Sequence, residues 1–103
     1  MELGRVSGTV VATQKNEALA GHKLLVVDIL KLNGNASGTN VVALDTVGSG
    51  IGETVIIVRG SSARQAEGMS AVPVDATVIG IVDSVEVEGS IRYSKSKDDW
   101  TGQ

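Results

Sequence analysis

A glycine-rich segment, Gly48-Ser49-Gly50-Ile51-Gly52, has the composition of a loop that cradles a phosphate. A dinucleotide-binding fingerprint needs a helix directly after such a loop, because the amino end of the helix must face the phosphate. The residues that follow, Thr54 to Arg59 (TVIIVR), predict a strand instead. The P-loop pattern also fails, since the chain has no Gly-Lys-Ser or Gly-Lys-Thr. We therefore interpret the segment as a tight backbone turn.

Residues suited to catalysis or metal binding are few and scattered. Ser61 and Ser62 lack the Gly-x-Ser-x-Gly setting of a nucleophile, and the sole histidine, His22, lies in a different predicted loop. The chain has no cysteine, which excludes disulfides, thiolate metal sites and a cysteine nucleophile. The carboxylates in or beside predicted strands are Asp28, Asp45, Asp75 and Asp83. They match no metal-ligand spacing and are typical of turn formers, so we expect no enzyme, no metal and no cofactor.

Charge and aromatic content argue against nucleic acid and membrane partners. The net charge is -3 and the pI about 5.0, opposite in sign to what phosphate backbones attract. Only Tyr93 and Trp100 could stack on bases, and both lie near the carboxyl end. No apolar stretch approaches the roughly 20 residues that span a bilayer, and the start MELGRVSG has no signal core. We expect a soluble cytoplasmic protein that begins at Met1.

The elements that would position these residues are short, valine-rich strands. They are expected at Leu3 to Thr13, Lys23 to Leu32, Val41 to Val47, Thr54 to Arg59, Asp75 to Glu88 and Ile91 to Lys95. Helix is the alternative for the second of these, whose apolar residues fall on much of both faces. In the first, Gly4 and Gly8 share a face with Val6 and Val10, and glycine inside a strand marks a bend or a close backbone approach.

Turn signals separate the strands. Asn33-Gly34 predicts a turn within a polar loop that runs to Asn40. Ser62 is placed to cap one short helical turn that ends at Ala66. Gly80 predicts a bend in the long strand from Asp75 to Glu88. In the polar tail, Trp100 is either exposed to solvent or an anchor in a pocket.

No predicted helix is long enough to cover a sheet, so the strands must close on themselves. The expected fold class is all-β, a small closed five-stranded barrel with one short helical turn. A chain of 103 residues allows one domain, which we place at residues 1–95 with a polar tail at 96–103. Because so small a barrel buries a limited area, assembly into an oligomer would stabilise it.

Three segments, in their order and spacing along the chain, carry a resemblance to a known family. They are Val42 to Val58 (VALDTVGSGIGETVIIV), Gly60 to Gln65 (GSSARQ) and Pro73 to Asp83 (PVDATVIGIVD). With the start LGRVSGTVVATQK and the segment KLLVVD, their order and spacing resemble the pentameric vertex proteins of bacterial microcompartment shells. The family commonly reads Gly-Ala-Gly where this chain has Gly48-Ser49-Gly50, and the tail from Ser96 matches no family motif.

The resemblance implies a barrel of the oligonucleotide-binding type that forms a cyclic homopentamer. Each pentamer would fill a fivefold vertex of a polyhedral shell in the cytoplasm, with hexameric and trimeric shell proteins as partners. The role would be geometric and not catalytic.

Glycine loops suit a crowded pentamer axis or subunit interface, because they let backbones approach closely. The candidate residues for the pore, axis and interface are Gly48, Ser49, Gly50, Gly52, Glu53, Gly60, Ser61, Ser62, Ala63 and Arg64. We assign the second loop, from Gly60, to the pore rim. We also expect Arg64 to pair with a carboxylate such as Glu53 of its own or an adjacent chain. At Gly50 we expect a left-handed backbone or a close contact.

The alternative function is a ring-forming β-barrel of the co-chaperonin type, which would assemble on a chaperonin. Such a protein needs a mobile loop with an apolar tripeptide that grips its partner. The predicted loop from Gln14 to His22 contains only Ala18-Leu19-Ala20 as an apolar cluster. The vertex-protein interpretation is therefore preferred.

Overall fold

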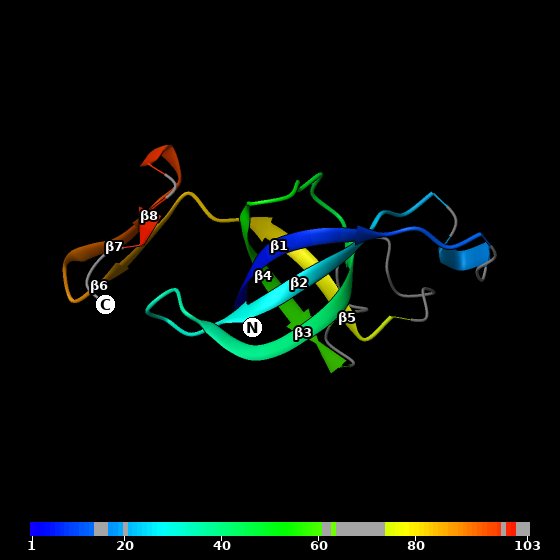
Figure 1. The fold of residues 1–103 in the computed structure, drawn as a ribbon, viewed down its shortest axis with the longest axis horizontal. Helices are drawn as coiled ribbons and strands as arrows, with labels where there is room; N and C mark the ends of the chain where they lie inside the picture. The colour runs from blue at the N-terminus through cyan, green and yellow to red at the C-terminus, as the bar shows by residue number, and fades with distance from the viewer. Residues whose placement is uncertain (14–16, 20, 61–62, 64–73, 98, 101–103) are drawn as a thin grey trace.

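Five strands close into a barrel in the computed structural model, which describes residues 1–13, 17–19, 21–60, 63, 74–97 and 99–100. The strands are β1 (Glu2–Val10), β2 (Leu24–Leu30), β3 (Ala36–Asp45), β4 (Thr54–Arg59) and β5 (Ala76–Ile81). Their order around the barrel is β1-β2-β3-β5-β4 (Figure 1). Neighbouring strands are antiparallel except for the short parallel pair of β3 and β5. The predicted all-β class and the closed five-stranded barrel are confirmed.

Aliphatic side chains fill the barrel. Strand β2 shows the pattern most clearly, because Leu25, Val27 and Ile29 are buried and alternate with partly exposed residues. The buried core cluster consists of Val6, Leu25, Val27, Ile29, Ala43, Val55, Ile57, Ala76 and Val78. An alternating strand therefore forms here, and the helix alternative for Lys23 to Leu32 is wrong.

A bulge in β1 changes which face its second half presents. The pairing with β2 shifts between Val6 and Gly8. Val6 lies opposite the buried Val27, whereas Gly8 lies opposite Val26, which is on the outer face of β2. Directly opposed residues share a face, so the prediction that Gly8 and Val10 lie on the face of Val6 is wrong. The bulge leaves Ser7 as the extra residue and exposed.

The β2–β3 turn, Lys31 to Asn35, contains the predicted Asn33-Gly34 pair. The Gly34 N–H donates to the Lys31 carbonyl oxygen at 2.9 Å, and the Lys31 N–H donates to the Asn35 carbonyl oxygen at 2.8 Å. Strand β3 begins directly afterwards, at Ala36, so the polar residues up to Asn40 are strand and not loop. They are exposed on the barrel surface, and the pairing of Ala36 with Leu30 and of Asn40 with Asp28 holds the two ends of this segment against β2.

The predicted long strand from Asp75 to Glu88 is two strands in different sheets. Strand β5 ends at Ile81, and β6 (Ser84–Val87) belongs to a separate three-stranded sheet with β7 (Ser90–Ser94) and β8 (Asp99–Trp100). We call residues 84–100 the carboxyl-terminal arm. Figure 1 shows the arm beyond the β2–β3 turn, at one end of a molecule that is 44 Å long and 24 Å wide. The division at residue 95 stays a prediction, and the arm contains residues on both sides of it.

Short 3-10 turns complete the described chain. One covers Glu17–Leu19, before β2, and another covers Lys95–Lys97, between β7 and β8. The predicted helical turn from Ser62 to Ala66 lies outside the described residues apart from Ala63. Within the described ranges, no helix has the length and apolar character needed to cross a membrane.

Candidate functional site

The glycine turn, Gly48 to Glu53, joins β3 to β4. Gly48 and Gly52 have φ angles of 77° and 91°, in the left-handed region that glycine tolerates best. The φ of Gly50 lies outside this region, so the left-handed positions of the turn are Gly48 and Gly52 and not, as predicted, Gly50. A Cβ at Gly50 would lie 3.6 Å from Glu53 Oε1, an ordinary contact within one chain. A close contact between chains at Gly50 stays a prediction.

A polar cluster of the buried Asp45 and Ser49 with the exposed Lys23 holds the turn. Ser49 is fully buried, and its hydroxyl donates to Asp45 Oδ1 at 3.0 Å. The ammonium of Lys23 donates to the Ser49 carbonyl oxygen at 2.5 Å and lies 3.6 Å from Asp45 Oδ2. Because the side chain of Asp45 is only 3% exposed, this carboxylate is an anchor for the backbone and not a ligand for solutes.

Glu53 connects the glycine turn to the carboxyl-terminal arm. Its Oε2 lies 2.9 Å from Lys95 Nζ, and its Oε1 accepts the Gly50 N–H at 2.6 Å. The hydrogen bond from Lys95 is the largest cause that lowers the pKa of Glu53, and the hydrogen bond from the Gly50 N–H lowers it further. The hydrogen bond to Glu53 in turn raises the pKa of Lys95. The predicted partner Arg64 lies outside the described residues, so its pairing stays a prediction.

The second candidate loop begins at Gly60, where β4 ends. Gly60 has a φ of 68°, and its N–H donates to the Asp75 carbonyl oxygen at 2.7 Å. Ala63 is fully buried, and its carbonyl oxygen accepts the Thr77 hydroxyl at 2.8 Å. Ser61, Ser62 and Arg64 lie outside the described residues.

The two candidate loops lie at opposite ends of β4. This strand has six residues, which span roughly 20 Å at about 3.3 Å per residue. The glycine turn instead docks on β1, where the Gly52 N–H donates to the Val6 carbonyl oxygen at 2.8 Å. The structure therefore does not bring the two sets of predicted residues together into one site.

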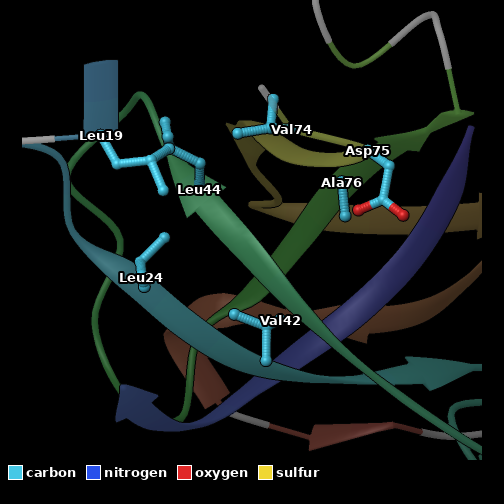
Figure 2. A pocket seen from close by; sticks show the side chains of 7 residues that line it. All are labelled: Leu19, Leu24, Val42, Leu44, Val74, Asp75 and Ala76. Atoms are coloured by element: carbon cyan, nitrogen blue, oxygen red, sulfur yellow. The ribbon is translucent and has the colours of Figure 1, made fainter. Parts of the chain in front are cut away.

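An apolar pocket on the outside of the barrel is a feature that the sequence reasoning missed. It has a volume of about 250 Å³ and is lined by Leu19, Leu24, Val42, Leu44, Val74, Asp75 and Ala76 (Figure 2). Leu44 is 1% exposed, and Leu19, Leu24 and Val74 pack against it. Val42 is 52% exposed, which is high for an aliphatic residue. The signal was present in the sequence, because a barrel strand that is apolar on both faces must present one face outward.

Catalytic or metal chemistry gains no support from the described part of the chain. No three His, Cys, Asp or Glu side chains gather there in a way that could hold a metal ion. The polar groups that do gather, around Asp45 and Glu53, bind backbone and lysine. The fold and its surface thus define a class of small β-barrel whose distinctive parts are anchored loops and an apolar outer face, as in proteins that assemble.

Comparisons with known proteins identify the family. The family described as ethanolamine utilisation protein EutN/carboxysome matches residues 1–83. The microcompartment shell vertex protein EutN of Salmonella typhimurium is 45% identical over 95 residues, which are 92% of this chain and 96% of the relative. The vertex protein GrpN of Rhodospirillum rubrum is 55% identical over 86 residues, or 84% and 97% of the two chains. This chain belongs to the EutN/CcmL family of bacterial microcompartment shell vertex proteins.

Solved structures agree with this family. Gloeobacter violaceus CcmL has a TM-score of 0.88 at 45% identity and covers 93% of this chain and 99% of its own. The Rhodospirillum rubrum pentameric shell protein GrpN has a TM-score of 0.77 at 54% identity, with 84% and 99% covered. The predicted resemblance is confirmed, and the family is structural and not enzymatic. The co-chaperonin alternative is set aside.

Proposed function

We propose that this chain forms a cyclic homopentamer that closes the fivefold vertices of a bacterial microcompartment shell. The observation that carries the proposal is the likeness, over most of the barrel, to a relative described as pentameric. A flat sheet of hexamers cannot close into a polyhedron, and a five-membered ring at each corner supplies the curvature. The expected neighbours in the shell are hexameric and trimeric shell proteins.

A ring of this kind needs two different complementary patches on each subunit, because a cyclic interface is heterologous. The apolar pocket supplies one of them. Its exposed Val42 and the partly buried Leu24 and Val74 are apolar surface that a second copy of this chain would remove from water. The carboxylate of Asp75 at the pocket gives the patch a polar group that can orient a neighbour.

The test is the mass of the assembly in solution, measured by light scattering. The wild-type chain should have the mass of five subunits. Val42→Lys should give monomers, because the side chain is exposed in one subunit but would be a buried charge in the ring. Leu32→Lys is the matched control, since Leu32 is 69% exposed but lies in the β2–β3 turn, away from the pocket.

The outcomes separate the two parts of the proposal. A wild-type chain that stays monomeric or dimeric at high concentration would contradict the ring. A pentamer that survives Val42→Lys would remove the pocket from the interface and leave the ring standing. Co-expression with hexameric shell proteins tests the vertex role, because closed shells should form with the vertex protein and open sheets or tubes without it.

A further inference from the structure

The only tryptophan of the chain is packed against the barrel and is not exposed in a polar tail. Trp100 belongs to β8, the last strand of the carboxyl-terminal arm, where it lies opposite Tyr93 of β7. The centroids of the two rings are 5.0 Å apart, with 34° between their planes. Tyr93 is 1% exposed and Trp100 is half-buried, so the pair forms the packed centre of the arm.

Trp100 also approaches the β2–β3 turn. A Cβ built on Gly34 would lie 2.4 Å from Trp100 Cδ2 and 2.5 Å from Trp100 Cγ. Only the missing side chain of glycine permits this approach. The same residue has a φ of 90°, which also favours glycine. Gly34 therefore serves two purposes, since it makes the turn and receives the indole.

We propose that residues 84–100 form a strap that docks on the barrel through Trp100, and that this contact fixes the direction of the arm. The chain leaves the barrel at Val82, whose N–H still donates to the Thr54 carbonyl oxygen at 2.8 Å. Beyond that point two contacts at different residues join the arm to the barrel, the Glu53–Lys95 ion pair and the approach of Trp100 to Gly34. Two separated contacts prevent a rotation that a single flexible connection would allow.

The strap lies outside residues 1–83, which the family model matches. It does not depend on the proposed ring, because all the contacts lie within one subunit. The contact is apolar packing, since Trp100 Nε1 is buried and has no hydrogen-bond partner among the described residues. A phenyl ring should therefore replace the indole better than a methyl group can.

The first test uses the fluorescence of the single tryptophan. In the wild-type protein its emission should be blue-shifted and weakly quenched by acrylamide. Gly34→Ala should shift the emission to the red and increase the quenching, because the new methyl group occupies the place of the indole. Gly38→Ala is the matched control: its φ is 92° in the same hairpin, but a Cβ there has no atom within 4 Å. Its emission should equal that of the wild type.

Equal emission from the Gly34→Ala and Gly38→Ala variants would overturn the proposal, as would wild-type emission that matches tryptophan free in water. A second test uses hydrogen–deuterium exchange in peptides of the arm. Trp100→Ala should speed exchange in β6 and β7 while β1 to β5 keep their protection, and Trp100→Phe should stay close to the wild type. Unchanged exchange in Trp100→Ala would contradict the strap, and none of these readouts depends on the number of subunits.

Discussion

Replacing Gly4 with alanine should destabilise the barrel, and the magnitude follows from the packing around it. The new Cβ would lie 2.4 Å from Val27 Cγ1, 2.8 Å from Ile57 Cδ1 and 3.2 Å from the Asp28 carbonyl oxygen. Val27 and Ile57 are fully buried core residues, so neither can move into solvent. Overpacking of this kind costs about 1–3 kcal/mol. The lower entropy of the unfolded alanine chain offsets about 0.4–1 kcal/mol of that.

Gly8 is the matched control on the same strand. A Cβ there would lie 3.8 and 3.9 Å from two atoms of Val26, and the φ of Gly8 is outside the left-handed region. Gly8→Ala should therefore be neutral or raise the free energy of unfolding by up to about 1 kcal/mol. Because the bulge at Ser7 lies between the two glycines, the same substitution meets the core at one position and open surface at the other.

The assay is thermal unfolding followed by circular dichroism, at one fixed subunit concentration because assembly shifts the midpoint. A loss of about 1–2 kcal/mol should lower the Tm of Gly4→Ala by roughly 4–16 °C for a domain of this size. The Tm of Gly8→Ala should be equal to that of the wild type or higher. Two variants with the same Tm would refute the assignment of Gly4 to a close approach inside the barrel.

Two further predictions concern the glycine turn. Ser49→Ala removes the hydroxyl that donates to Asp45. It should lower the free energy of unfolding in urea by about 1–2 kcal/mol, since Asp45 keeps its other partners. The control Ser84→Ala, at an exposed residue, should change the free energy of unfolding by less than about 0.5 kcal/mol, and equal effects of the two substitutions would contradict the cluster. The pKa of Glu53 is lowered from its ordinary value of 4.5, so its contribution to stability is complete above that pH and lost as the pH falls through the folded-state pKa. Glu53→Gln should flatten this acid-side loss in a series of unfolding curves from neutral to acidic pH, and an unchanged slope would contradict the Lys95 pairing.

Local signals in the sequence were sufficient to predict the bounds of a strand where turn-forming residues stand at both of its ends. Strand β4 was predicted with its observed bounds, Thr54 to Arg59, because glycines precede and follow a run of β-branched residues. The turn at Asn33-Gly34 was predicted because an Asn-Gly pair is itself a local turn signal. Alternation of apolar residues and turn chemistry together thus define most of the barrel.

The errors arose where partners distant in the sequence decide the structure. No glycine or proline separates Ile81 from Val87, yet the chain changes sheets there. The Val82 N–H still pairs with Thr54 of the barrel strand β4, whereas Ser84 already belongs to β6 of the second sheet. The bulge at Ser7 is also set by the register with β2, and a serine at this position does not by itself indicate a bulge. A period of two describes one strand, whereas a break or a bulge depends on which strand lies beside it.

For the candidate site too, the sequence indicated the local backbone of each loop but not the position of one loop relative to the other. The sequence marked the glycine turn and the loop from Gly60 as unusual backbone, and both contain left-handed glycines. It did not place them relative to each other, and β4 separates them by its full length. We do not expect two loops at opposite ends of β4, roughly 20 Å apart, to line the same narrow pore. If the loop from Gly60 forms the pore rim, as we predict from its glycine and small residues, then the glycine turn, anchored by Asp45 and Glu53, serves another part of the subunit surface.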